Sequence, residues 1–116
     1  MNLVPHFRVT GLDGHPVAYT SIWQRRNLVL VMLPDGGADD YIAQIEASMG
    51  ELTAHDTACV LTRDSVAGLP RPGVAIADRW GELFHVAAAL PAPAELVEWL
   101  RYAQMQCGGA CRTEER

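Results

Sequence analysis

The feature that most constrains the fold is a run of six consecutive apolar residues from Leu28 to Leu33. A half-buried strand alternates apolar and polar residues, whereas a strand covered on both faces is apolar throughout. The run contains branched residues, which favour an extended backbone, and it is ended by Pro34 with Gly36 and Gly37. We therefore expect a central strand that lies between two layers of an α/β domain.

A helix and a second strand should follow this central strand. Apolar residues recur at helical spacing between Asp39 and Leu52, with Asp39 or Asp40 as the N-cap and Gly50 as the weakest position. The apolar run at 58–62 predicts another buried strand. Because a strand-helix-strand unit crosses over in a right-handed sense, we expect the two strands to pair in parallel.

Two hairpins are expected on either side of this unit. Phe7 and Val9 alternate with polar neighbours before the turn residues 11–14, which predicts an N-terminal hairpin followed by a connector with one helical turn. Apolar runs at 74–77 and 83–88 flank a second glycine-containing turn. These two runs should form an antiparallel pair.

The last element expected is a helix that packs back on the sheet. Pro93 suits its first turn, apolar residues follow at helical spacing, and Gly108 with Gly109 predicts its end. No repeat or linker divides the chain. We therefore expect a single domain over residues 1–107 and a flexible tail over residues 108–116.

Composition and charge limit the classes of partner. The chain has 116 residues, of which 49% are hydrophobic, and this is enough for one ordinary core. Its net charge is −5 and its nine basic residues, all arginine, are scattered, so we expect no nucleic-acid partner. No apolar run approaches the roughly 20 residues of a membrane helix, and the N-terminus has no signal-peptide pattern. These features predict a soluble, cytoplasmic protein without a membrane partner.

Three stretches, at residues 11–17, 27–34 and 72–82, carry a resemblance to a known family. Their order along the chain, with the order of the expected elements, is similar to the thioredoxin superfamily and most of all to its peroxiredoxin and redoxin branch. The resemblance covers nearly the whole chain. It implies an α/β thioredoxin-like fold, in which a central mixed sheet of four to five strands is flanked by helices and preceded by an N-terminal β-hairpin.

The same resemblance points to a catalytic position that lacks its nucleophile. Members of the family carry a reactive cysteine just past the central strand, where the start of the next helix stabilises a thiolate. The corresponding segment here is 35–40, which contains no cysteine and carries three aspartates. Carboxylates would raise the pKa of a neighbouring thiol. We therefore expect no thiol chemistry at this position.

The resemblance also implies a peptide-binding groove. Relatives place a proline, usually cis, before the strand that follows the catalytic site, and Pro72 is the closest match, with Pro70 second. This loop faces the helix terminus, where Gly36 and Gly37 lie in this sequence. A groove without a nucleophile predicts a non-catalytic module that binds a protein or peptide, or a second copy of itself, with no cofactor and no metal.

The alternative function is that of a thiol-disulfide oxidoreductase or peroxidase that uses Cys107 and Cys111. Two thiols four residues apart across flexible glycines can approach disulfide distance. The same pair could supply two zinc ligands, but a tetrahedral site would need a second pair from another chain. The negative end of the final helix disfavours a thiolate at Cys107, so two exposed thiols in a tail are the simpler interpretation.

Other chemistry-bearing residues have structural interpretations. Asp35, Asp39 and Asp40 are explained by turn formation and helix capping rather than by a cation. Cys59 falls within an expected buried strand, where a free cysteine behaves as a small inert hydrophobe. Trp80 falls in an expected hairpin turn, where it could be exposed to a partner.

Overall fold

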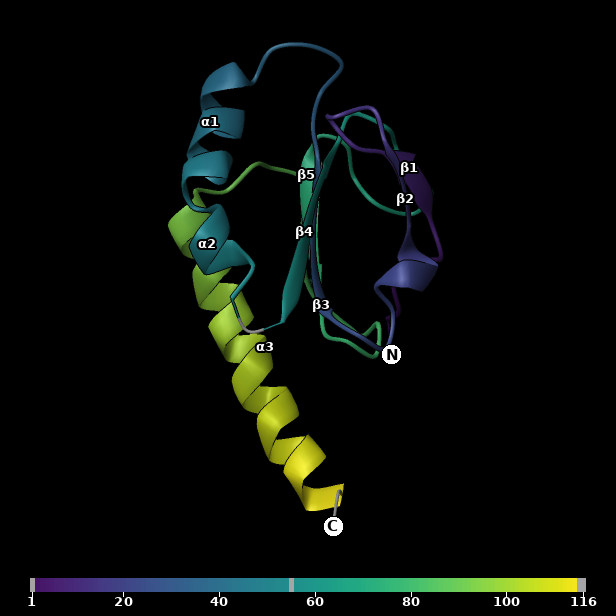
Figure 1. The fold of residues 1–116 in the computed structure, drawn as a ribbon, viewed down its shortest axis with the longest axis vertical. Coiled ribbons are helices and arrows are strands. Elements are labelled where there is room, and N and C mark those ends of the chain that lie inside the picture. Colours follow the sequence, from purple (N-terminus) through teal and green to yellow (C-terminus); the bar gives the residue numbers. More distant parts are fainter. Residues whose placement is uncertain (1, 55, 115–116) are drawn as a thin grey trace.

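The computed structural model describes residues 2–54 and 56–114, with residue 104 and residues 106–114 described by their backbone alone. Its elements begin with short strands and end with one long helix (Figure 1). In chain order they are β1 (Arg8–Thr10), β2 (Pro16–Ala18), the 3₁₀ turn η1 (Tyr19–Ser21), β3 (Asn27–Met32), α1 (Asp39–Ala47), α2 (Met49–Leu52), β4 (Thr57–Thr62), β5 (Gly73–Ala77), β6 (Leu83–Ala87) and α3 (Pro93–Glu114).

The central sheet has four strands in the order β4-β3-β5-β6. Strand β3 pairs in parallel with β4 and antiparallel with β5, and β5 pairs antiparallel with β6. A separate antiparallel pair is formed by β1 and β2. The mixed sheet, the parallel crossover and both hairpins are thus confirmed.

Two layers cover the central sheet (Figure 1). Helices α1, α2 and α3 lie on one face, and the β1–β2 hairpin with η1 lies on the other. Side chains of β3 alternate between the layers: Leu28 and Leu30 pack in the core on the hairpin side, and Val29 and Val31 pack in the core on the helix side. Every residue of β3 is buried, because one layer covers each face of the strand. This two-sided burial explains why the run from Leu28 to Leu33 is apolar throughout.

The helix expected over 39–52 is divided into α1 and α2 at Ser48, where the backbone leaves the helical region with φ −102° and ψ 10°. The expectation of an aspartate cap is wrong, because the N-cap is Ala38 with φ 65°. Asp39 and Asp40 instead lie in the first turn of α1. There they are stabilised by the positive end of the helix dipole rather than by a capping hydrogen bond.

Helix α3 continues to Glu114, so it does not end at the Gly108–Gly109 pair. A glycine inside a helix costs only about 1 kcal/mol relative to alanine, and neighbouring helix formers can offset that cost. Figure 1 shows the last turns of α3 projecting past the sheet. The flexibility of residues 108–116 stays a prediction, and residues 115 and 116 lie outside the described part of the chain. Neither α3 nor another described helix is long and apolar enough to cross a membrane.

Candidate functional site

The predicted groove residues lie in two loops, one between β3 and α1 and one before β5. The peptide bond between Arg71 and Pro72 is cis, at the position that the resemblance favours over Pro70. Pro72, Gly36 and Gly37 are exposed, and Pro70 is half-buried. The loop between β3 and α1 offers backbone groups and aspartates but no cysteine.

Arg63, directly after β4, holds the loop between β3 and α1 in place. Its Nη1 atom donates to the carbonyl oxygen of Pro34 at 2.7 Å, and its Nη2 atom donates to the carbonyl oxygen of Gly37 at 3.1 Å. Positive φ angles at Gly37 and Ala38 turn the chain into α1 at this point. The guanidinium group therefore uses two carbonyl oxygens that would otherwise need water.

Arg71, beside the cis bond, joins the two loops to each other. Its Nη1 atom lies 2.8 Å from Oδ1 of Asp35, 2.9 Å from the carbonyl oxygen of Arg63 and 3.3 Å from that of Leu33. The side chain of Arg71 is three-quarters buried, whereas that of Asp35 is 91% exposed. The hydrogen bonds from Arg71 to the two carbonyl oxygens therefore stabilise the contact between the loops more than the exposed ion pair with Asp35 does.

The described cysteine of the sheet, Cys59, is poorly suited to thiol chemistry. It lies in β4, facing the helix-side core, and burial raises the pKa of its thiol to about 12. Since the thiolate is the reactive form, Cys59 is inert near neutral pH. Cys107 and Cys111 lie outside the residues whose side chains are described, so their redox role stays a prediction.

We expect Cys59 to resist alkylation in the folded protein. In a Cys107→Ser/Cys111→Ser variant, reaction with iodoacetamide should accelerate only as the pH approaches about 12, whereas the unfolded chain should react with a midpoint near 9.0. Because the folded pKa is the higher one, the protonated thiol favours folding, and this contribution is present below pH 9.0 and is lost as the pH rises toward about 12. Stopped alkylation followed by mass spectrometry measures both midpoints. A folded-state midpoint near 9.0 would contradict the burial of the thiol.

Asp35, Asp39 and Asp40 do not gather into a cation site. Within the described residues, no group of three or more histidine, cysteine, aspartate or glutamate side chains lies close enough to hold a metal ion. Asp35 contacts Arg71, and the other two aspartates lie in the first turn of α1.

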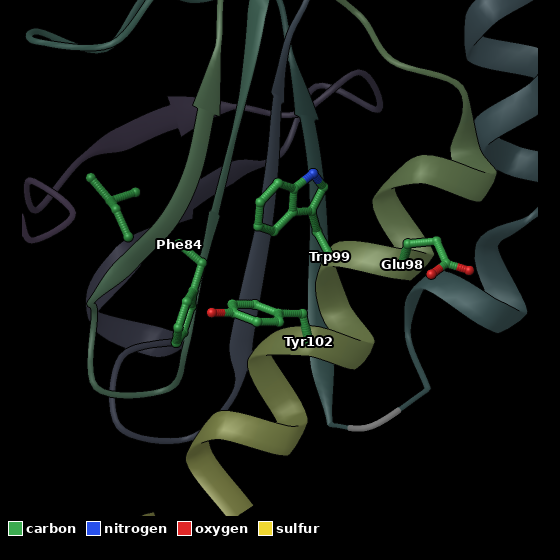
Figure 2. Close-up of a pocket in the computed structure, with 5 residues that line it drawn as sticks. Phe84, Glu98, Trp99 and Tyr102 are labelled. Carbon is green, nitrogen blue, oxygen red and sulfur yellow. The ribbon is translucent and has the colours of Figure 1, made fainter.

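A second candidate site is a hollow of about 500 Å³ between β6 and α3. Figure 2 shows the rings of Phe84, Trp99 and Tyr102 gathered at this hollow. Tyr102 lies edge-on to both other rings, with centroid distances of 6.0 Å to Phe84 and 5.8 Å to Trp99. His85 stacks on Trp99 at 4.3 Å, which fixes the indole against the strand. Among the described residues of the lining, Glu98 supplies the charged side chain.

The strand beside this hollow, β6, forms one edge of the central sheet. The N–H group of Leu83 donates to the carbonyl oxygen of Asn2, which covers the start of β6. From Phe84 to Ala87 the outer side of β6 has no strand partner within the described residues. A further hollow of about 490 Å³, lined in part by Val86, lies on the opposite face of the strand. An open edge strand with an aromatic hollow beside it is a favourable place for another chain to pair.

The sequence did not predict the residues that shape the two candidate sites, which are the loops around Pro72 and the hollow at β6. Arg63 and Arg71 look like two of many scattered arginines, and their only signal is that Arg63 directly follows a buried strand and Arg71 lies two residues before the next one. Phe84 and Tyr102 give no signal by themselves, because only the packing of α3 on β6 brings them together. Trp80 is 51% exposed, as its turn position predicts.

Comparisons with known proteins show the fold. No family model matches the chain, and no curated protein matches it. Among solved structures, the reduced 2-Cys peroxiredoxin of Plasmodium vivax is 11% identical, with a TM-score of 0.74 over 90% of this chain and 96% of that chain. A thioredoxin family thiol:disulfide interchange protein of Chlorobium tepidum is 10% identical, with a TM-score of 0.58 over 89% of this chain and 96% of that chain. The chain therefore has the thioredoxin-like fold that peroxiredoxins and thiol:disulfide interchange proteins share.

Proposed function

We propose that this chain is a thioredoxin-fold binding module that holds an extended segment of a partner protein against β6 and performs no thiol chemistry in the loop between β3 and α1. The observation that carries the proposal is the aromatic hollow beside the open edge of β6. Main-chain hydrogen bonds to an edge strand give affinity, and a pocket beside it selects a side chain.

The chemistry of the hollow suits an apolar side chain of the bound segment. Aromatic rings offer large contact areas with little loss of side-chain entropy, and Tyr102, which is 47% exposed, can still gain burial on binding. The ring contacts among Phe84, Trp99 and Tyr102 hold the hollow open before a ligand arrives. A preformed hollow loses less free energy on binding than one that must be assembled.

The loop with the cis peptide bond is a weaker candidate for the same role. Pro72, Gly36 and Gly37 are exposed there, but Arg63 and Arg71 already use the carbonyl oxygens of neighbouring residues. Fewer backbone carbonyl groups of this loop therefore remain free to hydrogen-bond with an extended ligand. The absence of a cysteine from this loop also removes the nucleophile on which family chemistry depends.

Peptides selected from a display library against the folded chain provide the test. Phe84→Ala and Tyr102→Ala should each weaken binding of the selected peptides about tenfold or more, because both remove aromatic contact area from the hollow. Leu12→Ala is the matched control, since Leu12 is a similarly exposed apolar residue that lines neither hollow at β6. Titration by fluorescence anisotropy measures the three affinities.

The Cys107→Ser/Cys111→Ser variant separates this function from the oxidoreductase alternative. Peptide binding should be unchanged in the variant, because none of the described residues that line the hollow is a cysteine. Peroxide consumption or disulfide reduction that the wild type shows and the variant loses would instead establish the enzyme. Analytical ultracentrifugation shows whether a second copy occupies β6: a dimer that Tyr102→Ala dissociates would identify the partner as this same chain.

A further inference from the structure

A second surface lies at the opposite end of the sheet from the loop between β3 and α1. The turn that precedes β3 and the turn between β5 and β6 meet there, near the N-terminus (Figure 1). We call it the tryptophan-arginine surface, and it comprises Trp23, Arg25, Arg26, Arg79 and Trp80. None of these residues lines the hollow at β6.

Hydrogen bonds join the two turns into one fixed unit. The Nε1 atom of Trp23 donates to the carbonyl oxygen of Trp80 at 3.3 Å, and the N–H group of Gln24 donates to the carbonyl oxygen of Arg79 at 2.6 Å. The buried carboxylate of Asp78 accepts from the N–H group of Trp80 at 2.9 Å and so shapes the second turn. The surface is therefore preorganised rather than formed by mobile side chains alone.

Two indole rings are left exposed on this unit. Trp80 is 51% exposed and Trp23 is 36% exposed. Gly81, with φ 88°, allows the turn to lie close over the buried ring of Tyr19, since a Cβ atom there would be 3.3 Å from its hydroxyl oxygen. The turn thus directs Trp80 outward while its backbone packs inward, and an exposed tryptophan is among the residues that most often dominate an interface.

Three arginine side chains lie on the two turns that carry these rings, and the second turn also carries Asp78 and Glu82. The surface carries three of the nine arginines, whereas the net charge of the whole chain is −5. Arg25 and Arg26 are exposed, and neither takes part in an ion pair within the described residues. Arg79 contacts Asp56 at 3.4 Å, and the side chain of Asp56 is 64% exposed. The guanidinium groups of Arg25 and Arg26 therefore remain available for carboxylates of a partner.

We propose that the tryptophan-arginine surface docks a short acidic segment of a partner protein. Arginine binds carboxylates in a bidentate geometry, and the indole rings cover the apolar side chains between them. Charge complementarity favours a short acidic segment over a nucleic acid, because a long polyanion would meet the acidic remainder of the chain. This docking is independent of the function proposed for β6, since the two surfaces share no residue.

Binding of a fluorescein-labelled peptide of glutamate and leucine tests the proposal on the full chain. An Arg25→Glu/Arg26→Glu variant should bind the peptide at least about tenfold more weakly than wild type, and Trp80→Ala should show a loss of similar size. An Arg8→Glu/Arg101→Glu variant changes the net charge equally at other exposed positions, so it should bind nearly as well as wild type. Circular dichroism confirms that each variant is folded.

Three outcomes would overturn the proposal. The first is that the wild type fails to bind the glutamate peptide or binds a lysine version of it equally well. The second is that both double variants lose affinity for the peptide to the same extent, which would show that the net charge of the chain, and not this surface, controls binding. The third is that oligothymidylate binds to the surface more tightly than the peptide, which would make the partner a nucleic acid. The Tyr102→Ala variant should lose binding of the selected peptides at β6 but keep binding of the glutamate peptide at the tryptophan-arginine surface. The two proposals can therefore fail independently of each other.

Discussion

Replacement of Gly73 by alanine is expected to destabilise the fold by about 3 kcal/mol, since overpacking a closely packed site typically costs 1–3 kcal/mol. A Cβ atom at this position would lie 2.5 Å from the carbonyl oxygen of Ala87 and 2.8 Å from both Cγ and the carbonyl oxygen of Pro70. Two of these three atoms belong to the backbone, so the clash cannot be relieved by rotating a side chain. Either the pairing of β5 with β6 or the loop that carries Pro70 must shift.

Gly50→Ala is the matched control for this substitution. Nothing lies within 4 Å of a Cβ atom at Gly50, which is part of helix α2. Alanine there should stabilise the fold by roughly 0.4–1 kcal/mol, because it restricts the unfolded chain. Urea unfolding measures both changes. Equal stability of Gly73→Ala and wild type would show that the start of β5 is less tightly packed than the structure indicates.

Truncation of Leu100 to alanine is expected to cost about 3 kcal/mol, within the range of 2–5 kcal/mol for a buried leucine. Leu100 is 1% exposed and packs in the helix-side core with Leu96 and Ile76. The variant loses the apolar area and leaves a cavity where α3 rests on the sheet. Because α3 also carries Trp99 and Tyr102, the aromatic hollow should be disturbed along with the stability.

Tyr102→Ala, on the same helix, provides the comparison. Tyr102 is 47% exposed, so its removal should cost less than about 1 kcal/mol while it weakens binding at β6. Thermal unfolding followed by circular dichroism distinguishes the two variants. A Leu100→Ala variant as stable as Tyr102→Ala would argue against the docking of α3 on the sheet.

The strands were the most predictable part of this protein. The run from Leu28 to Leu33 has no polar member, every one of its side chains is buried, and a strand between two layers buries side chains on both of its faces. The glycine turns before β2 and β6 likewise predicted antiparallel strand pairs, because a tight hairpin turn needs a residue with a positive φ angle and glycine adopts one readily. In the structure, Gly14 and Gly81 have φ angles of 86° and 88°. These signals are local, so they survive without knowledge of the tertiary structure.

The helix termini were less predictable. Asp39 and Asp40 are good capping residues, yet Ala38 takes the cap because the turn from Gly37 fixes its backbone at φ 65°. Ser48, rather than Gly50, divides the expected helix. Local preferences at such positions differ by about 1 kcal/mol or less, so the packing of α1 and α2 on the sheet can override them.

The sequence by itself determined the layered α/β architecture, the thioredoxin-like order of elements and the lack of a thiol between β3 and α1. The tertiary structure alone decided which residues meet: Arg71 with Leu33 across 38 positions of the chain, and Phe84 with Tyr102 across the edge of the sheet. The physical reason is that the burial of a strand or helix depends on the spacing of its apolar residues, which can be read from a short segment of the sequence. Binding surfaces depend instead on side chains that come together only after the sheet and α3 have packed.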